Sequence, residues 1–518
     1  MSHLEHLDFL ARVARDHAGQ QADEAPPILG PVLKALRASD ASLEGKTYEF
    51  SGTNSVGPGW LIQSKPQRSD CPLLTAIENL LSQVVGQNPG TAHFIDIAHL
   101  GTAPDNFWML DRIAEALVQL AGHSRQPITV RYLEGNPHDP DKPHAFAFAN
   151  KVLEMTRGQT QLANMRMFFG NLDVPWLLGI DDRLPGSWNH AKIFAADGAS
   201  SIVGGMNYWG DYRPGGNPLY DVAIQVDGQA AASSQRYADY LWSAGVGYGS
   251  WSSHRSLTLG DSELGSAMPP SFSSFPPPPP ASGRLPVLGV GNLGLWGIRD
   301  QRMLIEEYEF NLHFEPIHPQ NTYHSLMESP NVPLRFPFWR WDYGSAAAQQ
   351  ASAAARHLVL QQMGQGQRIR VSQQKIADTD TANTSDPAKG FVVWPGNFLD
   401  DMAGALRRGA DVDILLSHHE AYYSGGYSDD MGGEALRGVI ESRAGTASGT
   451  LTIRQTPPGV YNHGKVWIAD DQAFFVGSDN IYPGYLQEYG YVVADQALTH
   501  QFVSDYWDPI WQEAVAVS

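Results

Sequence analysis

Two copies of one short pattern contain the side chains of this chain that are best suited to chemistry. Each copy has a histidine, a lysine two residues later, an aspartate seven residues after the histidine, and a Gly-(Gly/Ser)-x-Asn turn seven residues after the aspartate. The residues are His190, Lys192, Asp197, Gly204, Gly205 and Asn207 in the first copy, and His463, Lys465, Asp470, Gly477, Ser478 and Asn480 in the second. One copy alone would be weak evidence, because short patterns recur by chance. Two full copies with identical offsets exclude coincidence.

The spacing inside each copy predicts a β-hairpin. Apolar residues follow each lysine, pass through a short turn at Asp197 or Asp470, and continue to the glycines. Residues i and i+2 of an extended strand face the same way, so each histidine should project together with its lysine. The glycines, Gly205 among them, let backbone approach a ligand closely.

Two such hairpins facing each other would form a cage for a tetrahedral phosphate diester. The two lysines would neutralise the phosphate, and the carboxamides of Asn207 and Asn480 would hydrogen-bond its oxygens. The paired histidines would divide the roles of nucleophile and general acid. The residues alone therefore predict phosphodiester chemistry.

The elements around the two copies also repeat. An apolar helical stripe runs through Leu110 and Leu117 and stops at Gly122, and a similar stripe runs through Leu399 and Leu406 and stops at Gly409. Short β-like runs flank each helix: residues 94–97 and 128–133 in the first half, and 369–372 and 412–416 in the second. This order predicts an α/β fold of two similar halves, each a parallel-type sheet covered by helices.

A proline-rich stretch separates the two halves. Residues 260–283 contain Pro276 to Pro280 among Ser and Gly, which predicts an extended surface linker, with a docking site for a proline-binding partner as the alternative. We therefore expect one half over 1–259, the linker, and a second half over 284–518. A further polar stretch, 378–389, is predicted to be a loop.

Composition restricts the class of protein. The 518 residues carry 35 basic and 55 acidic side chains, a net charge of −20, which disfavours sequence-independent nucleic-acid binding. The single cysteine, Cys71, can form neither an intramolecular disulfide nor a cysteine-based zinc site. The chain as given shows no signal peptide and no apolar run near the roughly 18 residues of a membrane span. We expect a soluble protein, either exported (mature or signal-independent) or cytoplasmic.

The two motifs resemble those of the phospholipase D superfamily, the HKD phosphodiesterases. The resemblance extends, in order from about Leu43 to Trp511, to the secreted actinobacterial phospholipases D. The phrases that carry it are residues 187–190 (SWNH), 205–209 (GMNYW), 371–374 (VSQQ), 424–428 (SGGYS), 477–483 (GSDNIYP) and 486–491 (LQEYGY). Unlike the secreted relatives, this chain has one cysteine and no visible signal, and the segment 305–341 also differs. The resemblance implies the phospholipase D fold, with the active site between two halves packed about a pseudo-twofold.

The resemblance also implies residue roles. His190 would be the nucleophile, and His463 would protonate the leaving alcohol and later activate water or an acceptor alcohol. Asp221 and Glu488, the latter where the family often has Asp, would orient the histidines. Asp197 and Asp470 would be structural. The substrate contacts would come from Lys192, Lys465, Asn207, Asn480, Ser478 and Gly205. Independently of the resemblance, aromatic residues near the motifs would suit a rim that meets lipid: Trp188, Trp209, Tyr212, Tyr427 and Tyr482.

The expected activity is that of a phospholipase D: metal-independent hydrolysis of glycerophospholipids such as phosphatidylcholine to phosphatidate and free alcohol, through a phosphohistidine. Acceptor alcohols would receive the phosphatidyl group instead. No cofactor, metal or nucleic acid is expected, and we expect a monomer acting at a membrane or micelle surface. A nuclease-like HKD enzyme and a lipid-binding module without catalysis are the alternatives.

Three weaker patterns favour ordinary structure. Residues 289–294 match G-x-G-x-x-G but lack a following helix, so nucleotide binding is disfavoured. A metal site at His138, Asp139, Asp141 and His144 is disfavoured against a polar loop. A polar loop is also favoured over a role at the rim of the site for His418, His419 and Glu420.

Overall fold

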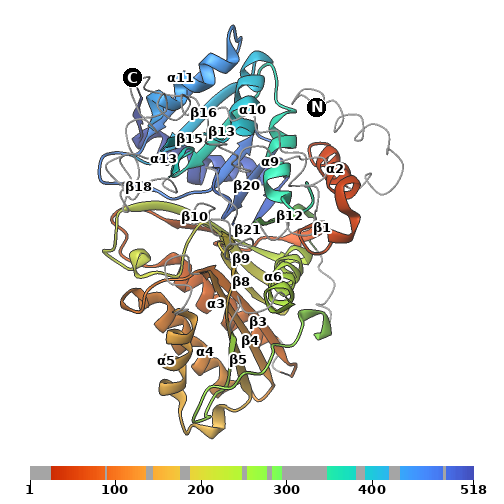
Figure 1. Cartoon of the computed structure of the whole chain (residues 1–518), viewed down its shortest axis with the longest axis vertical. Helices are drawn as coiled ribbons and strands as arrows, with labels where there is room; N and C mark the ends of the chain where they lie inside the picture. Colours follow the sequence, from red (N-terminus) through yellow and green to blue (C-terminus); the bar gives the residue numbers. More distant parts are fainter. Residues whose placement is uncertain are drawn as a thin grey trace, which may run out of the picture.

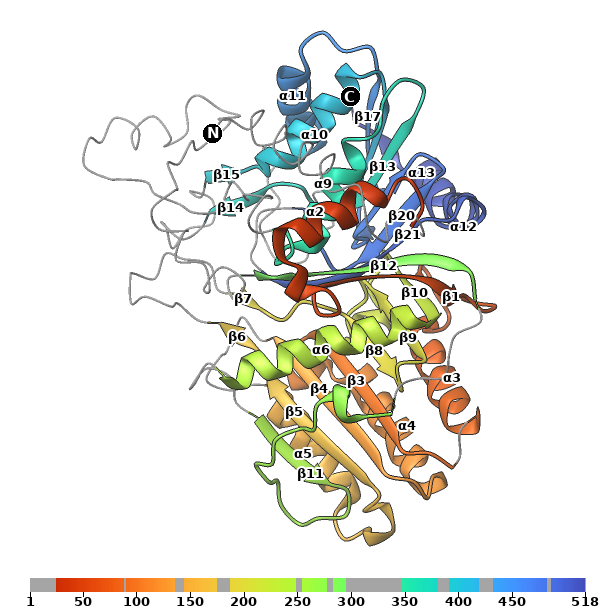
Figure 2. The same ribbon diagram turned by 90° about the vertical axis from the view of Figure 1, so that its right-hand side faces the viewer.

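The computed structural model describes residues 25–87, 90–135, 144–174, 187–247, 254–276, 283–294, 347–380, 391–418, 432–481 and 486–517. Figure 1 shows two stacked halves, the first drawn mainly in orange and yellow and the second in teal and blue. Each half is a mixed β-sheet with helices on both faces (Figures 1 and 2). The α/β fold of two similar halves, predicted from the sequence, is confirmed.

The first sheet has a parallel centre flanked by antiparallel strands. Its order is β11 (His254–Thr258), β5 (Met165–Asn171), β4 (Ile128–Gly135), β3 (His93–Leu100), β8 (Ile193–Ala196), β9 (Ser200–Gly204) and β10 (Leu219–Gly228). The pairs β3–β4 and β4–β5 are parallel. One face is covered by α3 (Pro72–Gln87), α4 (Trp108–His123) and α5 (His144–Thr156), and the other by α6 (Gln229–Gly247).

The second sheet repeats this order. It runs β17 (Leu451–Gln455), β16 (Asp411–Leu416), β13 (Arg368–Gln373), β19 (Val466–Ala469), β20 (Ala473–Gly477) and β21 (Gln487–Val493), with β16 parallel to both β13 and β17. The short β22 (Val515–Ala516) continues the outer edge, as β11 does in the first half. Its helices are α9 (Ala351–Leu360), α10 (Gly396–Arg407), α11 (Gly433–Ala444), α12 (Gln496–Phe502) and α13 (Asp508–Glu513), with one π-helical turn at Val503–Trp507. The strand–helix–strand repeat and its parallel pairing match the sequence prediction.

Four further strands pair with the facing edges of these two sheets. They are β1 (Tyr48–Ser55), β2 (Leu61–Ser64), β12 (Leu285–Leu293) and β18 (Tyr461–Asn462), while β6 (Asp173–Val174) with β7 (Ser187–Trp188) and β14 (Asp378–Asp380) with β15 (Phe391–Val393) form separate two-stranded ladders. β12 pairs with β21 on one side and with β1 on the other. β1 in turn pairs with β10 of the first half, and β10 also pairs with β18 of the second. The sheet is therefore continuous from one half into the other.

The two motif hairpins turn through backbone that most residues avoid. Asp197 (φ 56°) and Asp470 (φ 53°) occupy the left-handed region, which aspartate tolerates better than bulky residues. The Asp197 carboxylate accepts hydrogen bonds from the Phe94 amide (2.6 Å), and lies 2.8 Å from His93 Nδ1. The Asp470 carboxylate accepts one from the Arg368 amide (3.3 Å). Both aspartates thus tie a hairpin turn to the start of the neighbouring strand, at the end remote from the histidines.

A shared apolar core joins the halves. It combines Val222 and Tyr237 of the first half with Val466, Phe474 and Tyr491 of the second. Two polar contacts are buried within it, Ser201–Tyr491 (2.7 Å) and Ser233–Tyr489 (2.9 Å). Burying this surface on both partners fixes how the two motifs face each other.

Two expectations about the segments between elements need correction. The stretch 260–283 was expected to be an extended surface linker. Within its described part, Phe272 is buried and its ring lies 5.5 Å from that of Phe94, so this part packs against the first half. The expected loop over 378–389 begins instead as a strand, β14, while 381–390 lie outside the described residues.

The expected boundary at 259/260 stays a prediction. Packing crosses it, because α2 (Gly30–Asp40) buries Val32, Leu33 and Leu36 in the core of α9 and α10. Figure 1 shows α2 in red beside α9.

Among the helices that the structure describes, none has both the length and the apolar character that a membrane span requires.

Candidate active site

Both motif histidines lie where the halves meet, and each one contacts a carboxylate from the opposite half. His190 Nδ1 lies 2.9 Å and 3.0 Å from the two carboxylate oxygens of Glu488, on β21. His463 Nδ1 lies 2.7 Å from Asp221 Oδ2, on β10. The two expected acids are therefore at the site, but each serves the histidine of the other half rather than the histidine that precedes it in the sequence.

Backbone pairing between the halves produces this crossing. The His190 amide donates to the Gln487 carbonyl, one residue before Glu488, and the His463 amide donates to the Tyr220 carbonyl, one residue before Asp221 (both 2.8 Å). These backbone hydrogen bonds place each histidine next to the carboxylate residue of the other half. Neither pair can form unless the two halves dock.

An asparagine immediately before each histidine fixes the motif strand from the other side. Asn189 Nδ2 donates to the His99 carbonyl (3.0 Å) and lies 3.4 Å from the Leu133 carbonyl. Asn462 Nδ2 donates to the Gln373 and Leu415 carbonyls (3.0 and 3.2 Å). Both side chains are fully buried and reach the carboxyl ends of two parallel strands. Neither asparagine was predicted to have a role, although an Asn directly precedes each motif histidine in the sequence.

Each motif lysine contacts the backbone of its own histidine, and both residues lie just before the strands β8 and β19 rather than within them. Lys192 Nζ donates to the His190 carbonyl (2.6 Å), and Lys465 Nζ donates to the His463 carbonyl (2.8 Å). Both lysines are buried, 2% and 0% exposed. Two ammonium groups are therefore held in a low-dielectric pocket, where an anion would be strongly attracted.

Burial and mutual repulsion shift the pKa values of this cluster. Burial first, then Lys192, Lys465 and His463, holds the pKa of His190 well below its usual value. Burial and Lys465 lower the pKa of His463 to about 4 although Asp221 opposes the shift. Burial lowers the pKa of Lys465 to about 8. The free site therefore holds neutral imidazoles and lysines that are easily deprotonated.

The acid partner of His190 is also perturbed. Burial raises the pKa of Glu488 to about 8, against the attraction of Lys192. His190 and Glu488 are therefore coupled, so that the protonation of one depends on that of the other. The nucleophilic form of that pair carries the proton on Nδ1, facing the carboxylate, and leaves the Nε2 lone pair free.

Equivalent positions in the two Gly-(Gly/Ser)-x-Asn turns behave differently. Ser478 is buried and its hydroxyl donates to Glu488 Oε2. Its expected contact with a phosphoryl oxygen stays a prediction. At the matching Gly205, a Cβ atom would lie 2.4 Å from Asp221 Oδ1, so only glycine fits. Asn207 is buried, and its Oδ1 atom has no hydrogen-bond partner among the described residues, whereas Asn480 is partly exposed.

The expected aromatic rim is only partly visible. Trp188 and Trp209 are partly exposed, and the Trp209 indole donates to the Leu100 carbonyl (3.1 Å). Tyr212 is buried against Asp221 rather than at a rim, which corrects that expectation. Tyr427 and Tyr482 lie outside the described residues.

The weaker patterns have ordinary structural explanations where they are described. Gly289 and Gly291 lie inside strand β12, where Cβ atoms would meet Tyr489 and Tyr237 at 2.4 Å, so no phosphate-binding turn exists there. His144 begins α5, and the other three candidate ligands lie outside the described residues. The His418 amide donates to Thr456 Oγ1 (3.0 Å), and His419 and Glu420 are not described. Within the described parts of the chain, no cluster of three metal-ligating side chains is present.

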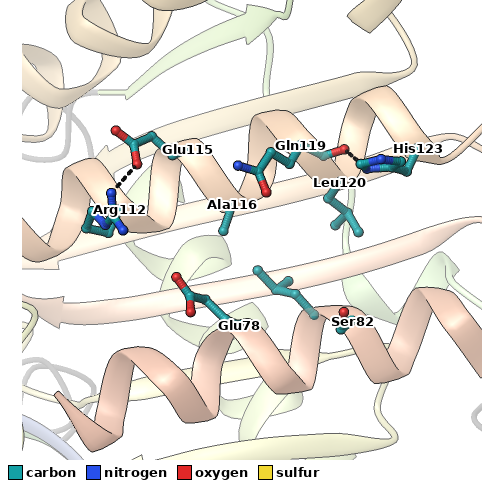
Figure 3. Close-up of a pocket in the computed structure, with 9 residues that line it drawn as sticks. Glu78, Ser82, Arg112, Glu115, Ala116, Gln119, Leu120 and His123 are labelled. Carbon is teal, nitrogen blue, oxygen red and sulfur yellow. Dashed lines mark hydrogen bonds and ion pairs between the residues drawn. The ribbon is translucent and has the colours of Figure 1, made fainter. Parts of the chain in front are cut away.

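A hollow elsewhere on the surface is unrelated to this chemistry. Figure 3 shows it between α3 and α4, where Glu78, Arg112, Glu115 and His123 line its edges. Arg112 pairs with Glu115 on one helix (3.0 Å), and both are about half exposed. Such exposed charges are well hydrated, and none resembles the buried cluster at the histidines.

Comparison with known proteins agrees with the geometry. Phospholipase D of Streptomyces antibioticus is 26% identical over 535 residues, covering 95% of this chain and 88% of the relative. The crystal structure of a phosphatidylserine synthase from Haemophilus influenzae Rd KW20 superposes with a TM-score of 0.50, covering 93% of this chain and 92% of its own at 14% identity. That structural match bears on the fold alone. No protein-family model matches the chain.

Proposed function

Because this chain belongs to the phospholipase D superfamily, we propose that it cleaves the headgroup-side phosphodiester of glycerophospholipids to phosphatidate and a free alcohol. The observation that carries the proposal is the pair of crossed histidine–carboxylate contacts with two buried lysines beside them. Similarity to a phospholipase D over nearly the whole chain supports lipid as the proposed substrate class. The net charge of −20 disfavours a nucleic acid.

In the first half-reaction, His190 Nε2 attacks phosphorus and the bond to the headgroup oxygen breaks. His463 donates its Nε2 proton to that oxygen, so the alcohol leaves neutral and a phosphohistidine remains on His190. Lys192 and Lys465 offset the charge on the phosphoryl oxygens, and the Nδ2 amide of the buried Asn207 would donate a hydrogen bond to one of them.

In the second half-reaction, His463 accepts a proton from water, whose oxygen attacks phosphorus and displaces His190. Phosphatidate is released and both imidazoles return to their starting state. An alcohol in place of water gives a phosphatidyl alcohol by the same steps. No metal is needed in this scheme, because the lysines and carboxamides supply the charge stabilisation.

The two histidines differ in a way that supports this division of roles. The His463 side chain is 22% exposed, whereas that of His190 is 6% exposed. The residue that acts as general acid and then as general base must reach both the departing alcohol and the arriving water. The more exposed histidine, His463, suits that role. A nucleophile benefits from exclusion of water from the covalent intermediate.

Protonation of His463 depends on the substrate. Lys465 and Lys192 disfavour the imidazolium in the free site, and the bound diester anion would offset both lysines. Binding would therefore raise the pKa of His463 toward the value that a general acid needs at neutral pH. Asp221 would then hold the imidazolium in place.

Mass analysis of products from a panel of defined phospholipids tests the proposal. We expect phosphatidate and free headgroup from phosphatidylcholine, and phosphatidylethanol when ethanol is added. Plasmid DNA under the same conditions serves as the control. Diglyceride or lysolipid as the main product, or DNA cleavage at a comparable rate, would contradict the assignment.

A further inference from the structure

The Tyr212 hydroxyl lies at the contact between His463 and its acid. Tyr212 Oη donates to Asp221 Oδ2 (2.6 Å) and lies 3.3 Å from His463 Nδ1. Tyr212 is only 3% exposed, so its phenol cannot be a general surface contact for lipid. Asp221 is fully buried, and its other oxygen accepts from the Val222 amide (2.8 Å).

In the second half, as in the first, a hydroxyl group donates to the carboxylate that contacts the histidine. There the hydroxyl of Ser478 donates to Glu488, the acid that contacts His190. The matching position in the first half is Gly205, where the contact with Asp221 leaves no room for a side chain. Tyr212 supplies the hydroxyl from a different segment, so each histidine–carboxylate pair has one.

The segment that carries Tyr212 is anchored by polar contacts. The Arg68 guanidinium donates to the carbonyls of Tyr212 and Asn217 (both 3.0 Å) and also to that of Asp211. Asn106 accepts from the Gly210 amide (2.8 Å). These contacts fix the direction of the phenol, because a planar guanidinium holds several carbonyls at once.

We propose that Tyr212 is a positioning residue that lowers the basicity of His463 by sharing the Asp221 carboxylate. A carboxylate that accepts a second hydrogen bond stabilises the imidazolium less strongly. The phenol also keeps Asp221 aligned with Nδ1, so that Nε2 faces the substrate. The inference rests on the acid–base role proposed for His463.

Other charges act on His463 from every side. Asp221 contacts it from β10, Lys465 lies two residues along its own segment, and Lys192 acts from the opposite motif, where His190 also lies. None of these is altered by replacing Tyr212 with phenylalanine, which removes only the hydroxyl. The change in the titration of His463 therefore reports the phenol alone.

The test is a titration of His463 by NMR in the full-length protein, with the signal assigned from His463→Ala. Tyr212→Phe should move the midpoint upward by about half a pH unit or more, because the carboxylate loses a donor. Tyr208→Phe is the matched control, since Tyr208 lies on the same segment with its ring 4.9 Å from that of His99. It should leave the midpoint unchanged, and Arg68→Lys should move it in the same direction as Tyr212→Phe.

Kinetics give an independent readout. Tyr212→Phe should lower kcat about five- to tenfold with little change in KM, and the acid limb of its pH profile should follow the titration. An unchanged His463 midpoint in Tyr212→Phe would overturn the proposal, even if activity fell. The titration needs no substrate, so it decides the role of Tyr212 even if the product analysis were to reject a lipid substrate.

Discussion

The two histidine–carboxylate pairs have the same plan but different surroundings. His190 is almost closed off and contacts a glutamate, with a serine hydroxyl from the adjacent turn. His463 is more accessible and contacts an aspartate, with a tyrosine hydroxyl from an anchored segment. The difference suits a division of work in which one histidine holds a covalent intermediate and the other exchanges protons with alcohols and water. Two similar halves thus surround their histidines with chemically different groups while keeping the same histidine–carboxylate contact.

Replacing either histidine with alanine tests whether both imidazoles are needed for turnover, and this change should have the largest effect. His190→Ala and His463→Ala should each lower turnover of phosphatidylcholine by about 10⁴-fold or more, because each imidazole acts in both half-reactions. Initial rates of choline release measure this. A loss of less than about tenfold in either variant would show that the replaced histidine does not act in both half-reactions.

Replacing Asp221 or Glu488 tests whether each carboxylate acts on the histidine of the other half. Asp221→Asn should lower kcat by about 10²- to 10⁴-fold and disturb the NMR titration of His463, leaving that of His190 nearly unchanged. Glu488→Gln should do the reverse. An Asp221→Asn protein in which only the His190 signal moves would refute the crossed pairing.

Removal of the asparagines tests whether the two halves fix their histidines alike. Asn189→Ala and Asn462→Ala should each lower kcat by about ten- to a hundredfold and the free energy of unfolding by about 1 to 3 kcal/mol, because each leaves buried carbonyls without a donor. Urea unfolding and steady-state rates measure the two effects. Asn164→Ala is the control, because the partly buried Asn164 donates to the Ser124 carbonyl (2.8 Å) just after α4 and contacts neither motif, so its loss should affect stability without kcat.

The pH dependence sharpens the role of the lysines. The pKa of Lys465 is lowered to about 8, so its charge is present below that value and is lost above it. We expect kcat/KM to fall as pH rises through about 8, since this parameter reports the free enzyme. Lys465→Arg, which cannot lose its charge, should move that limb to higher pH. An unmoved limb would assign it to another group, with Glu488→Gln as the next variant to measure.

Chelation should have the smallest effect. If the lysines supply the positive charge, saturating EDTA should change the rate on a soluble short-chain phosphatidylcholine by less than about twofold. A soluble substrate separates catalysis from effects of calcium on a lipid surface. A loss of more than about tenfold that calcium or magnesium restores would contradict the lysine-based scheme.

Local patterns in the sequence predicted the local geometry well. The offsets from His190 to Asn207 specify a hairpin, and the structure has it as β8 and β9, between the lysine and the asparagine. The repeated apolar stripes predicted α4 and α10 and their parallel strands. These features depend on residues close in the sequence, where periodicity is informative.

The long-range arrangement could not be predicted in the same way. The contact between Glu488 and His190 spans 298 residues and depends on how the shared core docks the halves. The direction of the Tyr212 phenol depends on Arg68, 144 residues away. Phe272 lies in a proline-rich stretch whose composition gave no sign that the ring is buried on Phe94. None of these contacts leaves a periodic signal in the chain.

The most direct test of the central claim is to trap the covalent intermediate. His463→Ala and His190→Ala are each mixed with a phosphatidyl p-nitrophenyl ester, whose leaving group needs no proton, and quenched rapidly without acid for intact-protein mass analysis. We expect a phosphatidyl adduct on His190 in His463→Ala, because the base for the second half-reaction is missing, and no adduct in His190→Ala. An adduct on His463 in His190→Ala, with none in His463→Ala, would contradict the assignment of the nucleophile.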